Sequence, residues 1–436
     1  MMESRIKELE SCFSRFPDVP REAVVKNDIL RLGLKFTEAA LRKTEGCRVK
    51  SYRLFTYDKV KYDQLKDAPF KAPEDLDIVG GPYDLRKTRI QVRLNADSLY
   101  TVDVIDGKIG VYENGSLIAR AMYPPAPDWY FKTFEDGTKY CDILAFAGPD
   151  AFITVYRICQ FWGEKEECKF CDINENVRQG TKHGKFSIPK AFKPMDQVVR
   201  VAKEAVQWEE KNSEGVRLRT SALLLTGGVI QGEVAGRTEE DFYLQYVEAL
   251  KSEVGGRIPI ILQTAPRDKE TFQRYRAAGV DISHSQIEVW DKDLFKVMCP
   301  GKERYIGRDQ WIKRVVESVE VFGEGNVTPG LVAGVELAQP DGFKEIDSAL
   351  RSMKEGFEFL MSHGVVVRYN QWNISPFSAL AGNQSPPLEY YIRLDQLWCE
   401  TWRKYNLPPP RGLGRMGPGL ALLSHSAFMD MDPVKC

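Results

Sequence analysis

The sequence predicts an α/β protein, because apolar strand candidates alternate with helix candidates through its central part. From about residue 150 the chain offers six such strands. That order favours parallel strands joined by right-handed crossovers. Six units are too few for a closed eight-stranded barrel, so the pattern by itself leaves a doubly wound sheet and a partial barrel open. The strand candidates are AFITVYRI (151–158), SALLLTGG (221–228), IPIILQTA (258–265), VDISHSQIEV (280–289), TPGLVAGVE (328–336) and GVVVRYNQW (364–372).

Helix candidates fill most of the connections between these strands. They carry apolar residues at helical spacing, and their lengths suit crossover helices. They are Met195–Asn212, Glu239–Val254, Asp268–Ala278, Gln310–Phe322 and Lys344–His363.

The N-terminal region predicts helices followed by a small antiparallel sheet. Apolar residues recur at helical spacing across Glu22–Lys43. The segment TRIQVRL (88–94) then alternates apolar and polar residues, and Asp106-Gly107 and Asn114-Gly115 are strong hairpin signals. We therefore expect an α+β cap domain over residues 1–140.

Two further parts complete the expected organisation. The strand–helix domain spans residues 150–380. A C-terminal helical extension spans residues 381–436 and begins with the aromatic segment Tyr390–Tyr405.

Composition excludes several classes of protein. The chain has 436 residues, of which 43% are hydrophobic and 28% charged, as in ordinary globular proteins. Lys and Arg number 61 against 62 Asp and Glu, so no overall basic field favours nucleic acid. No apolar run approaches the roughly 20 residues that span a bilayer, and the first residues lack the apolar core of a signal peptide. We expect a cytoplasmic protein without membrane or nucleic-acid partners.

Three of the nine cysteines lie within thirteen residues, as Cys159, Cys168 and Cys171. Their C-x8-C-x2-C spacing directly follows the first strand of the parallel series. Thiolates on such a loop form a soft metal site, suited to zinc or to an iron–sulfur cluster. Structural zinc needs four ligands, so Cys141 or His183 would have to reach it from afar. Three cysteines on a [4Fe–4S] cluster leave one iron open to a ligand.

This cluster resembles that of the radical S-adenosylmethionine (radical SAM) superfamily. The cysteines follow the first strand, and Phe170 holds the aromatic place before the last cysteine. The common spacing of that superfamily is C-x3-C-x2-C, so the first loop here is five residues longer. The resemblance implies a partial (β/α)6 barrel, a [4Fe–4S] cluster bound by the three cysteines, and S-adenosylmethionine (SAM) as the second cofactor.

Further segments resemble a branch that contains biotin synthase, HydE-type and tyrosine-lyase enzymes. Thr226-Gly227-Gly228 stands where the family has a Gly-Gly-Glu motif that contacts SAM, although Val229 replaces its glutamate. The resemblance implies that an acid and a following arginine hold the ribose and carboxylate of SAM, and that the fifth strand packs on the adenine. The matching positions are Glu288 and Arg308, with Arg304 as the rival arginine, and Ala333 and Gly334.

Substrate contacts are expected where polar residues end the sixth strand. We expect Arg368, Gln371 and Asn373 to contact substrate, and His284 on the fourth strand to face the same pocket. Two alternatives remain open: His284 has a structural role, and the other three are ordinary polar residues of a loop.

The resemblance implies a function. A reduced cluster would cleave SAM to a 5′-deoxyadenosyl radical, which would abstract hydrogen from a small organic substrate. Rearrangement, C–C cleavage and cofactor or natural-product biosynthesis are all compatible outcomes. Such an oxygen-sensitive enzyme needs a one-electron donor such as flavodoxin or ferredoxin. Two alternatives stay open: a SAM-cleaving aminocarboxypropyl transferase, and a zinc-stabilised binding protein that is not an enzyme.

Overall fold

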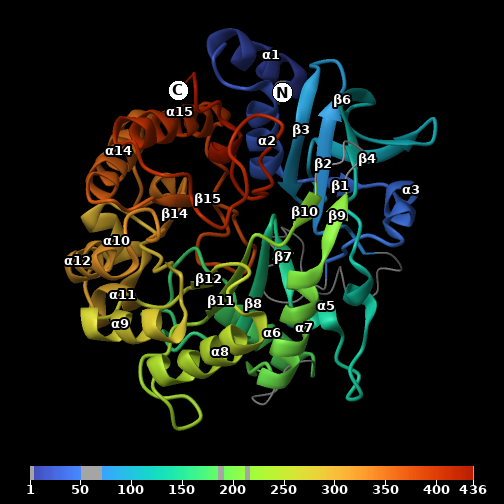
Figure 1. The fold of residues 1–436 in the computed structure, drawn as a ribbon. Coiled ribbons are helices and arrows are strands. Elements are labelled where there is room, and N and C mark those ends of the chain that lie inside the picture. The colour runs from blue at the N-terminus through green and yellow to red at the C-terminus, as the bar shows by residue number, and fades with distance from the viewer. Residues whose placement is uncertain (1–3, 51–70, 185–190, 212–216, 436) are drawn as a thin grey trace.

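The computed structural model describes residues 4–50, 71–184, 191–211 and 217–435. It confirms the predicted α/β class. An N-terminal antiparallel sheet lies beside a series of parallel strands that carry their helices on one face (Figure 1). The C-terminal helix α15 (Leu388–Lys404) packs on the N-terminal helix α2 (Arg21–Leu32).

The N-terminal sheet has six strands in the order β1-β4-β5-β6-β2-β3. Both predicted hairpins form: β4 pairs with β5 across Asp106-Gly107, and β5 pairs with β6 across Asn114-Gly115. All four of these turn residues have positive φ, which Gly, Asn and Asp tolerate best. The strands are β1 (Lys35–Phe36), β2 (Asp75–Gly80), β3 (Leu85–Gln91), β4 (Tyr100–Ile105), β5 (Lys108–Glu113) and β6 (Ser116–Met122).

The helix expected over Glu22–Lys43 is wrong in extent. Helix α2 ends at Leu32, because Gly33 follows with φ 74°. A Cβ at Gly33 would lie 2.7 Å from the carbonyl oxygen of Arg93, so the chain turns there against a neighbouring segment. The other helical elements of this part are α1 (Arg5–Arg15), α3 (Glu38–Leu41), η1 (Arg42–Thr44), η2 (Asp128–Phe131) and α5 (Tyr140–Ile143).

The central strands form an open series of six, which we call the arc. Strands β8, β11, β12 and β13 pair in parallel, as do β14 and β15. Single parallel bridges, from Ser283 to Val327 and from Glu288 to Leu331, join the two groups. Within the described residues no pairing joins β15 to β8. The strands are β8 (Asp150–Tyr156), β11 (Ala222–Gly227), β12 (Ile260–Leu262), β13 (Ile282–Ser283), β14 (Gly330–Ala333) and β15 (Arg368–Gln371).

Two short pairs flank the arc. Strand β7 (Ala145–Ala147) pairs antiparallel with β8, and β9 (Glu209–Lys211) pairs with β10 (Arg217–Arg219). The predicted fourth strand, 280–289, is mostly irregular, and the predicted helix Gln310–Phe322 divides in two at Ser318. The helix expected over Met195–Asn212 ends at Gln207, and Asn212 itself lies outside the described residues.

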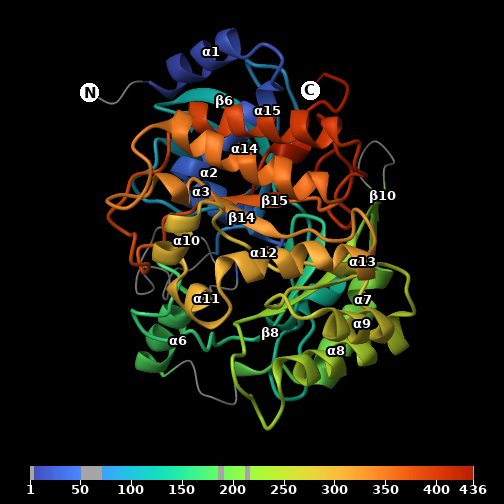
Figure 2. The same cartoon turned by 90° about the vertical axis from the view of Figure 1, so that its left-hand side faces the viewer.

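Helices cover the outer face of the arc. They include α7 (Met195–Gln207), α8 (Glu239–Val254), α9 (Lys269–Ala278), α12 (Arg308–Glu317), α13 (Val319–Phe322) and α14 (Ile346–Ser362). Figure 2 shows α14 and α15 side by side next to β14 and β15. The remaining elements are α6 (Ile173–Lys182), α10 (Lys292–Met298), α11 (Pro300–Tyr305), η4 (Val335–Leu337) and η5 (Phe428–Asp430). No described helix is both long enough and apolar enough to cross a membrane.

Successive side chains along each strand point alternately to this covered outer face and to an inner face. Ile153 and Leu225 are paired in register and join the large core shared with α7 and α8. The neighbouring residues Phe152, Leu224 and Ile261 are likewise in register and form a separate small cluster on the opposite face. The helices therefore leave one inner face of the arc uncovered.

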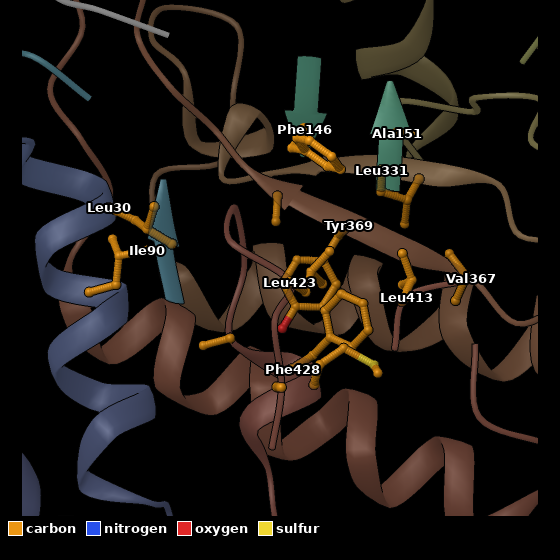
Figure 3. Close-up of a cluster of buried hydrophobic side chains, with 14 of the residues drawn as sticks. Leu30, Ile90, Phe146, Ala151, Leu331, Val367, Tyr369, Leu413, Leu423 and Phe428 are labelled. Atoms are coloured by element: carbon orange, nitrogen blue, oxygen red, sulfur yellow. The ribbon is translucent and has the colours of Figure 1, made fainter. Parts of the chain in front are cut away.

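The C-terminal segment closes the core between the arc and the N-terminal sheet. Figure 3 shows Leu423 and Phe428 of this segment among side chains that include Tyr369 of β15 and Ile90 of β3. A buried ion pair, Lys26 Nζ to Asp430 Oδ2 at 2.6 Å, ties the same segment to α2.

Buried Asp395 on α15 makes stability depend on pH. Burial raises the pKa of its carboxyl to about 7, although Tyr369 and Asn27 donate hydrogen bonds to it. The folded chain then holds a proton that the unfolded chain, with a carboxyl pKa near 3.9, loses earlier. Stability therefore falls as pH rises from about 4 to about 7. We expect Asp395→Asn to flatten this part of a plot of unfolding temperature against pH. The exposed Asp18→Asn is the control, and an unchanged slope in Asp395→Asn would contradict the assignment.

Candidate functional site

The three clustered cysteines converge at the end of β8. Burial, followed by the charge of Cys168, raises the pKa of Cys159 to about 12. A side-chain hydrogen bond with Cys299 and burial raise the pKa of Cys168, and burial and the charge of Cys168 raise that of Cys171. The three thiols therefore lie close enough for their charges to interact.

The three thiols have the chemistry of iron–sulfur cluster ligands, because cysteine thiolates hold such clusters. Among the described residues, no three His, Cys, Asp or Glu side chains are close enough to share a single metal ion. Ligation requires thiolates, and a bound metal favours the deprotonated form of its cysteine ligands. The donor set thus fits a [4Fe–4S] cluster.

Asn174, the second residue of α6, fixes the start of the cysteine loop. Its Oδ1 accepts from the backbone N–H of Cys159 at 2.9 Å, and its Nδ2 donates to the carbonyl oxygens of Cys159 at 3.1 Å and Phe161 at 2.9 Å. The side chain is buried, so these bonds have little competition from water. Asn174 is a positioning residue for Cys159.

Helix α11 clamps the middle of the lengthened loop. Glu166 accepts from Arg304 Nη1 at 2.6 Å and from the Tyr305 hydroxyl at 3.1 Å, and its carbonyl accepts from Gly301 N–H at 3.1 Å. A Cβ at Gly301 would lie 2.5 Å from that carbonyl oxygen, so only glycine permits this approach. The extra loop residues thus dock on α11, and this contact occupies Arg304, the rival arginine of the sequence prediction.

The Thr226-Gly227-Gly228 segment at the end of β11 lies directly against the same loop. A Cβ at Gly228 would stand 2.0 Å from the carbonyl oxygen of Ile158 and 2.5 Å from Cys159 Cα. Beyond it, the side chain of Gln160 accepts from the backbone N–H groups of Gln231 and Gly232. In this structure the glycines permit close packing of the cysteine loop, and Thr226 is buried beside them.

Glu288 lies beside a buried lysine that the sequence prediction missed. Lys302 Nζ donates to Glu288 Oε1 and to the carbonyl oxygen of Gln286, both at 2.9 Å, and lies 4.6 Å from the ring centre of Trp311. Burial opposes its charge, but Glu288 and Cys168 outweigh burial and raise the pKa of Lys302. Lys302 is therefore a buried cation next to the cysteines.

The predicted arginine, Arg308, is directed elsewhere. Its Nε donates to the carbonyl oxygen of Trp290 at 2.7 Å, its Nη1 donates to Asp309 at 3.1 Å, and its guanidinium lies over the Trp290 ring. Among the described residues, the cation bonded to Glu288 is therefore Lys302 and not Arg308. The position of Lys302 could not be found from sequence, because the unpredicted helix α11 turns it inward.

Phe170 and the end of β14 are brought together. Phe170 and Val332 both pack against an apolar cluster at this end of the arc, which contains Cys299 and Trp372. The next residues of β14 are tightly held. The carbonyl oxygen of Ala333 accepts from the Trp372 N–H at 2.9 Å, and Gly334 N–H donates to Glu336 Oε2 at 2.9 Å.

The four residues that were expected to contact substrate lie in different surroundings. His284 is buried with both ring nitrogens in hydrogen bonds, to Thr328 and Gln286, as the structural alternative expects. Gln371 Nε2 donates to the carbonyl oxygen of Asn27 on α2. Asn373 Oδ1 and Arg368 Nη1 are buried without a hydrogen-bond partner among the described residues.

Comparison with known proteins supports the superfamily. No family model matches the chain. A curated relative, bacteriochlorophyllide c C-7(1)-hydroxylase of Chlorobaculum limnaeum, is 21% identical over 331 residues, which cover 73% of each chain. We assign the chain to the radical SAM superfamily. It is an enzyme of a superfamily that uses a [4Fe–4S] cluster and SAM.

Solved structures resemble the chain only distantly. Methylornithine synthase (PylB) is 17% identical with a TM-score of 0.39, and the chain matches 62% of its length. HydG, a maturase of the [FeFe]-hydrogenase, is 12% identical with a TM-score of 0.37 over 47% of its length. Coproporphyrinogen III oxidase (HemN) of Escherichia coli is 12% identical with a TM-score of 0.30 over 41% of its length. The matched parts cover 57%, 57% and 43% of this chain. The chain thus spans less than two thirds of each of these proteins.

Asn174→Ala should reduce cluster loading without unfolding the protein. The variant removes the bonds that hold both backbone groups of Cys159, so the first cysteine loses its fixed position. We expect iron and sulfide per chain after anaerobic reconstitution to fall at least twofold. Gln179→Ala on the same helix removes only a bond to Glu175 and serves as the control. Full iron content in Asn174→Ala, with an unchanged circular dichroism spectrum, would contradict the positioning role.

Proposed function

We propose that this radical SAM enzyme abstracts hydrogen from a small organic substrate by way of a 5′-deoxyadenosyl radical. The observation that carries the proposal is the convergence of Cys159, Cys168 and Cys171 beside the Glu288–Lys302 pair. When bound, the cluster would supply one electron to SAM, which would divide into methionine and the radical. The radical then takes a hydrogen atom, leaving 5′-deoxyadenosine and a substrate radical.

The residues of the chain have separate tasks in this proposal. The three cysteines hold three irons and leave the fourth for SAM. Lys302 presents its ammonium to the carboxylate of SAM, and Glu288 accepts from the ribose hydroxyls. Phe170, Ala333 and Gly334 lie along the adenine. The apolar cluster around Cys299 and Trp372 keeps water from this end of the arc, which protects a radical from quenching.

The finer parts of the fold belong to the same proposal. We interpret the arc as the partial (β/α)6 barrel of the superfamily, with its site at the carboxyl ends of the strands. The boundaries 1–140, 150–380 and 381–436 remain our division of the chain. A cytoplasmic location and a flavodoxin or ferredoxin as electron donor are consistent with this chemistry.

The type of SAM cleavage separates this proposal from its alternatives. An aminocarboxypropyl transferase would release methylthioadenosine. The named activity of the curated relative, a hydroxylation, acts on a C–H bond and so favours hydrogen abstraction. A zinc-binding protein without enzymatic activity conflicts with the enzyme assignment.

We expect reduced, reconstituted protein to convert SAM to 5′-deoxyadenosine. The protein should be brown, with about four irons per chain. The triple variant Cys159→Ala, Cys168→Ala and Cys171→Ala should lose both colour and product. Chromatography of the quenched reaction gives the answer. Methylthioadenosine as the sole nucleoside product would favour the transferase, and a colourless protein holding one zinc would end the radical proposal.

Lys302→Met should weaken SAM binding. Truncating one partner of a buried charge pair costs about 2 kcal/mol or more, which corresponds to a roughly 30-fold increase in Kd. Equilibrium binding of SAM to the reconstituted protein measures this. Lys302→Arg keeps the charge and should recover part of the affinity, and Lys296→Met on the exposed side of α10 is the control. Equal affinity in Lys302→Met and Lys296→Met would exclude a contact with SAM.

A further inference from the structure

Two charged residues face each other across the gap in the arc. Asp150 is the first residue of β8, and Arg368 is the first residue of β15. Both belong to the inner face: Asp150 shares the alternation of Phe152, and Arg368 alternates with Tyr369, whose hydroxyl donates to Asp395 on the outer helix α15. β8 and β15 are the first and last strands of the parallel series, so these two side chains stand on either side of its opening, where the short β7 also pairs with β8.

Neither residue has its expected partner. Arg368 is 5% exposed and Asp150 is 1% exposed. Arg368 Nη1 and Asp150 Oδ1 have no hydrogen-bond partner among the described residues, and the two side chains form no ion pair within 4.0 Å there. Their charges still influence each other. Leaving a buried polar group without a hydrogen-bond partner is destabilising, and more so for a charged group. Such an arrangement needs a reason, and a bound ligand is one.

The C-terminal segment covers the opening from outside. The carbonyl oxygen of Ser424 accepts from the Gln91 N–H of β3 at 2.8 Å, and that of His425 accepts from the Gln371 N–H of β15 at 3.1 Å. Burial and the charge of Arg368 lower the pKa of His425, so this imidazole is neutral near pH 7. The cover therefore adds no second positive charge beside Arg368.

Part of the inner face is less densely filled than a closed core, although Leu224 and Ile261 on the same face are buried. Its residues Phe152, Gln263, Gln286, Val332 and Asn370 remain half-buried, although the outward residues beside them are buried. Three of these five side chains, Gln263, Gln286 and Asn370, are polar. This lining suits a polar ligand better than an apolar one.

Backbone pairing connects Arg368 with the strand that bonds to Glu288, a residue of the proposed SAM site. Arg368 pairs in register with Gly330 of β14. The carbonyl oxygen of Gly330 accepts from the Glu288 N–H at 3.0 Å. One strand thus separates Arg368 from the backbone of the residue that pairs with Lys302.

We propose that Arg368 binds a carboxylate of the substrate on the inner face of the arc, with Asp150 bonding a neighbouring polar group of the same molecule. The inference rests on the proposed function and names its substrate class, a small carboxylate. A guanidinium fork matches the two oxygens of a carboxylate. A phosphate monoester carries about −1.5 to −2 charges, which is more than the guanidinium of Arg368 supplies on this face.

The test uses simple anions as probes. Reconstituted protein is heated anaerobically at fixed pH and ionic strength with increasing acetate, propionate or inorganic phosphate, and its unfolding temperature is recorded. We expect a saturable rise with the carboxylates and none with phosphate. Arg368→Gln should abolish the rise, and Arg368→Lys should keep a weaker one. The exposed Arg411→Gln, whose guanidinium contacts only Asn326 among the described residues, is the control and should respond like the wild type.

Any of the following results would overturn the proposal. No carboxylate response, or an equal response in Arg368→Gln, would remove the site. A response to phosphate alone would assign a phosphate-bearing substrate instead. Without ligand, Arg368→Gln should unfold at the same temperature or higher, since an unpaired buried cation is lost; a fall would indicate a structural role. Binding is measured without SAM cleavage, so failure of the radical chemistry and failure of this site can be told apart.

Discussion

The buried ion pair between Lys26 and Asp430 joins the two ends of the chain. Both side chains are completely buried, and Lys26 also donates to the carbonyl oxygen of Leu423. Thr88 on β3 donates to the second oxygen of Asp430. A pair of this kind gains little over an apolar contact, but losing one partner costs about 3–5 kcal/mol. It therefore acts as a specific constraint that gives the C-terminal segment a single position.

The position of the C-terminal segment determines how the open side of the arc is covered. The segment lies where β15 and β8 fail to pair, and its backbone bonds to β3 and β15. A Cβ at Gly148, in the turn before β8, would stand 2.4 Å from the carbonyl oxygen of Leu422, so the contact reaches the other edge as well. The opening is thus covered by the C-terminal segment, next to the short strand β7 that pairs antiparallel with β8. Within the described residues, no parallel strand connects β15 to β8 at this place.

The cysteine end of the arc is held by a different kind of constraint. Polar side chains fix the backbone there: Asn174 at Cys159, Gln160 at the loop after β11, and Ser375, which donates to Asp172 next to Cys171. The contacts with α11 immobilise the extra residues of the first loop. The same short helix carries Lys302 inward on the neighbouring position to Gly301. The contact between the loop and α11 therefore both holds the extra loop residues and fixes the position of the buried Lys302.

The sequence by itself determined the alternating fold class, both hairpins and the three cysteines, because these signals are local. Alternation, Gly-containing turns and close cysteine spacing act within a few residues of the chain. Only the tertiary structure decided which cation lies at Glu288, because Lys302 and Arg308 are both within one short stretch and differ only in the direction that α11 and α12 give them. It alone also decided that His284 is internally bonded, and that Arg368 faces Asp150, more than two hundred residues away in sequence. Partners that distant are chosen by packing and by the closure of the chain ends, and no local pattern encodes them.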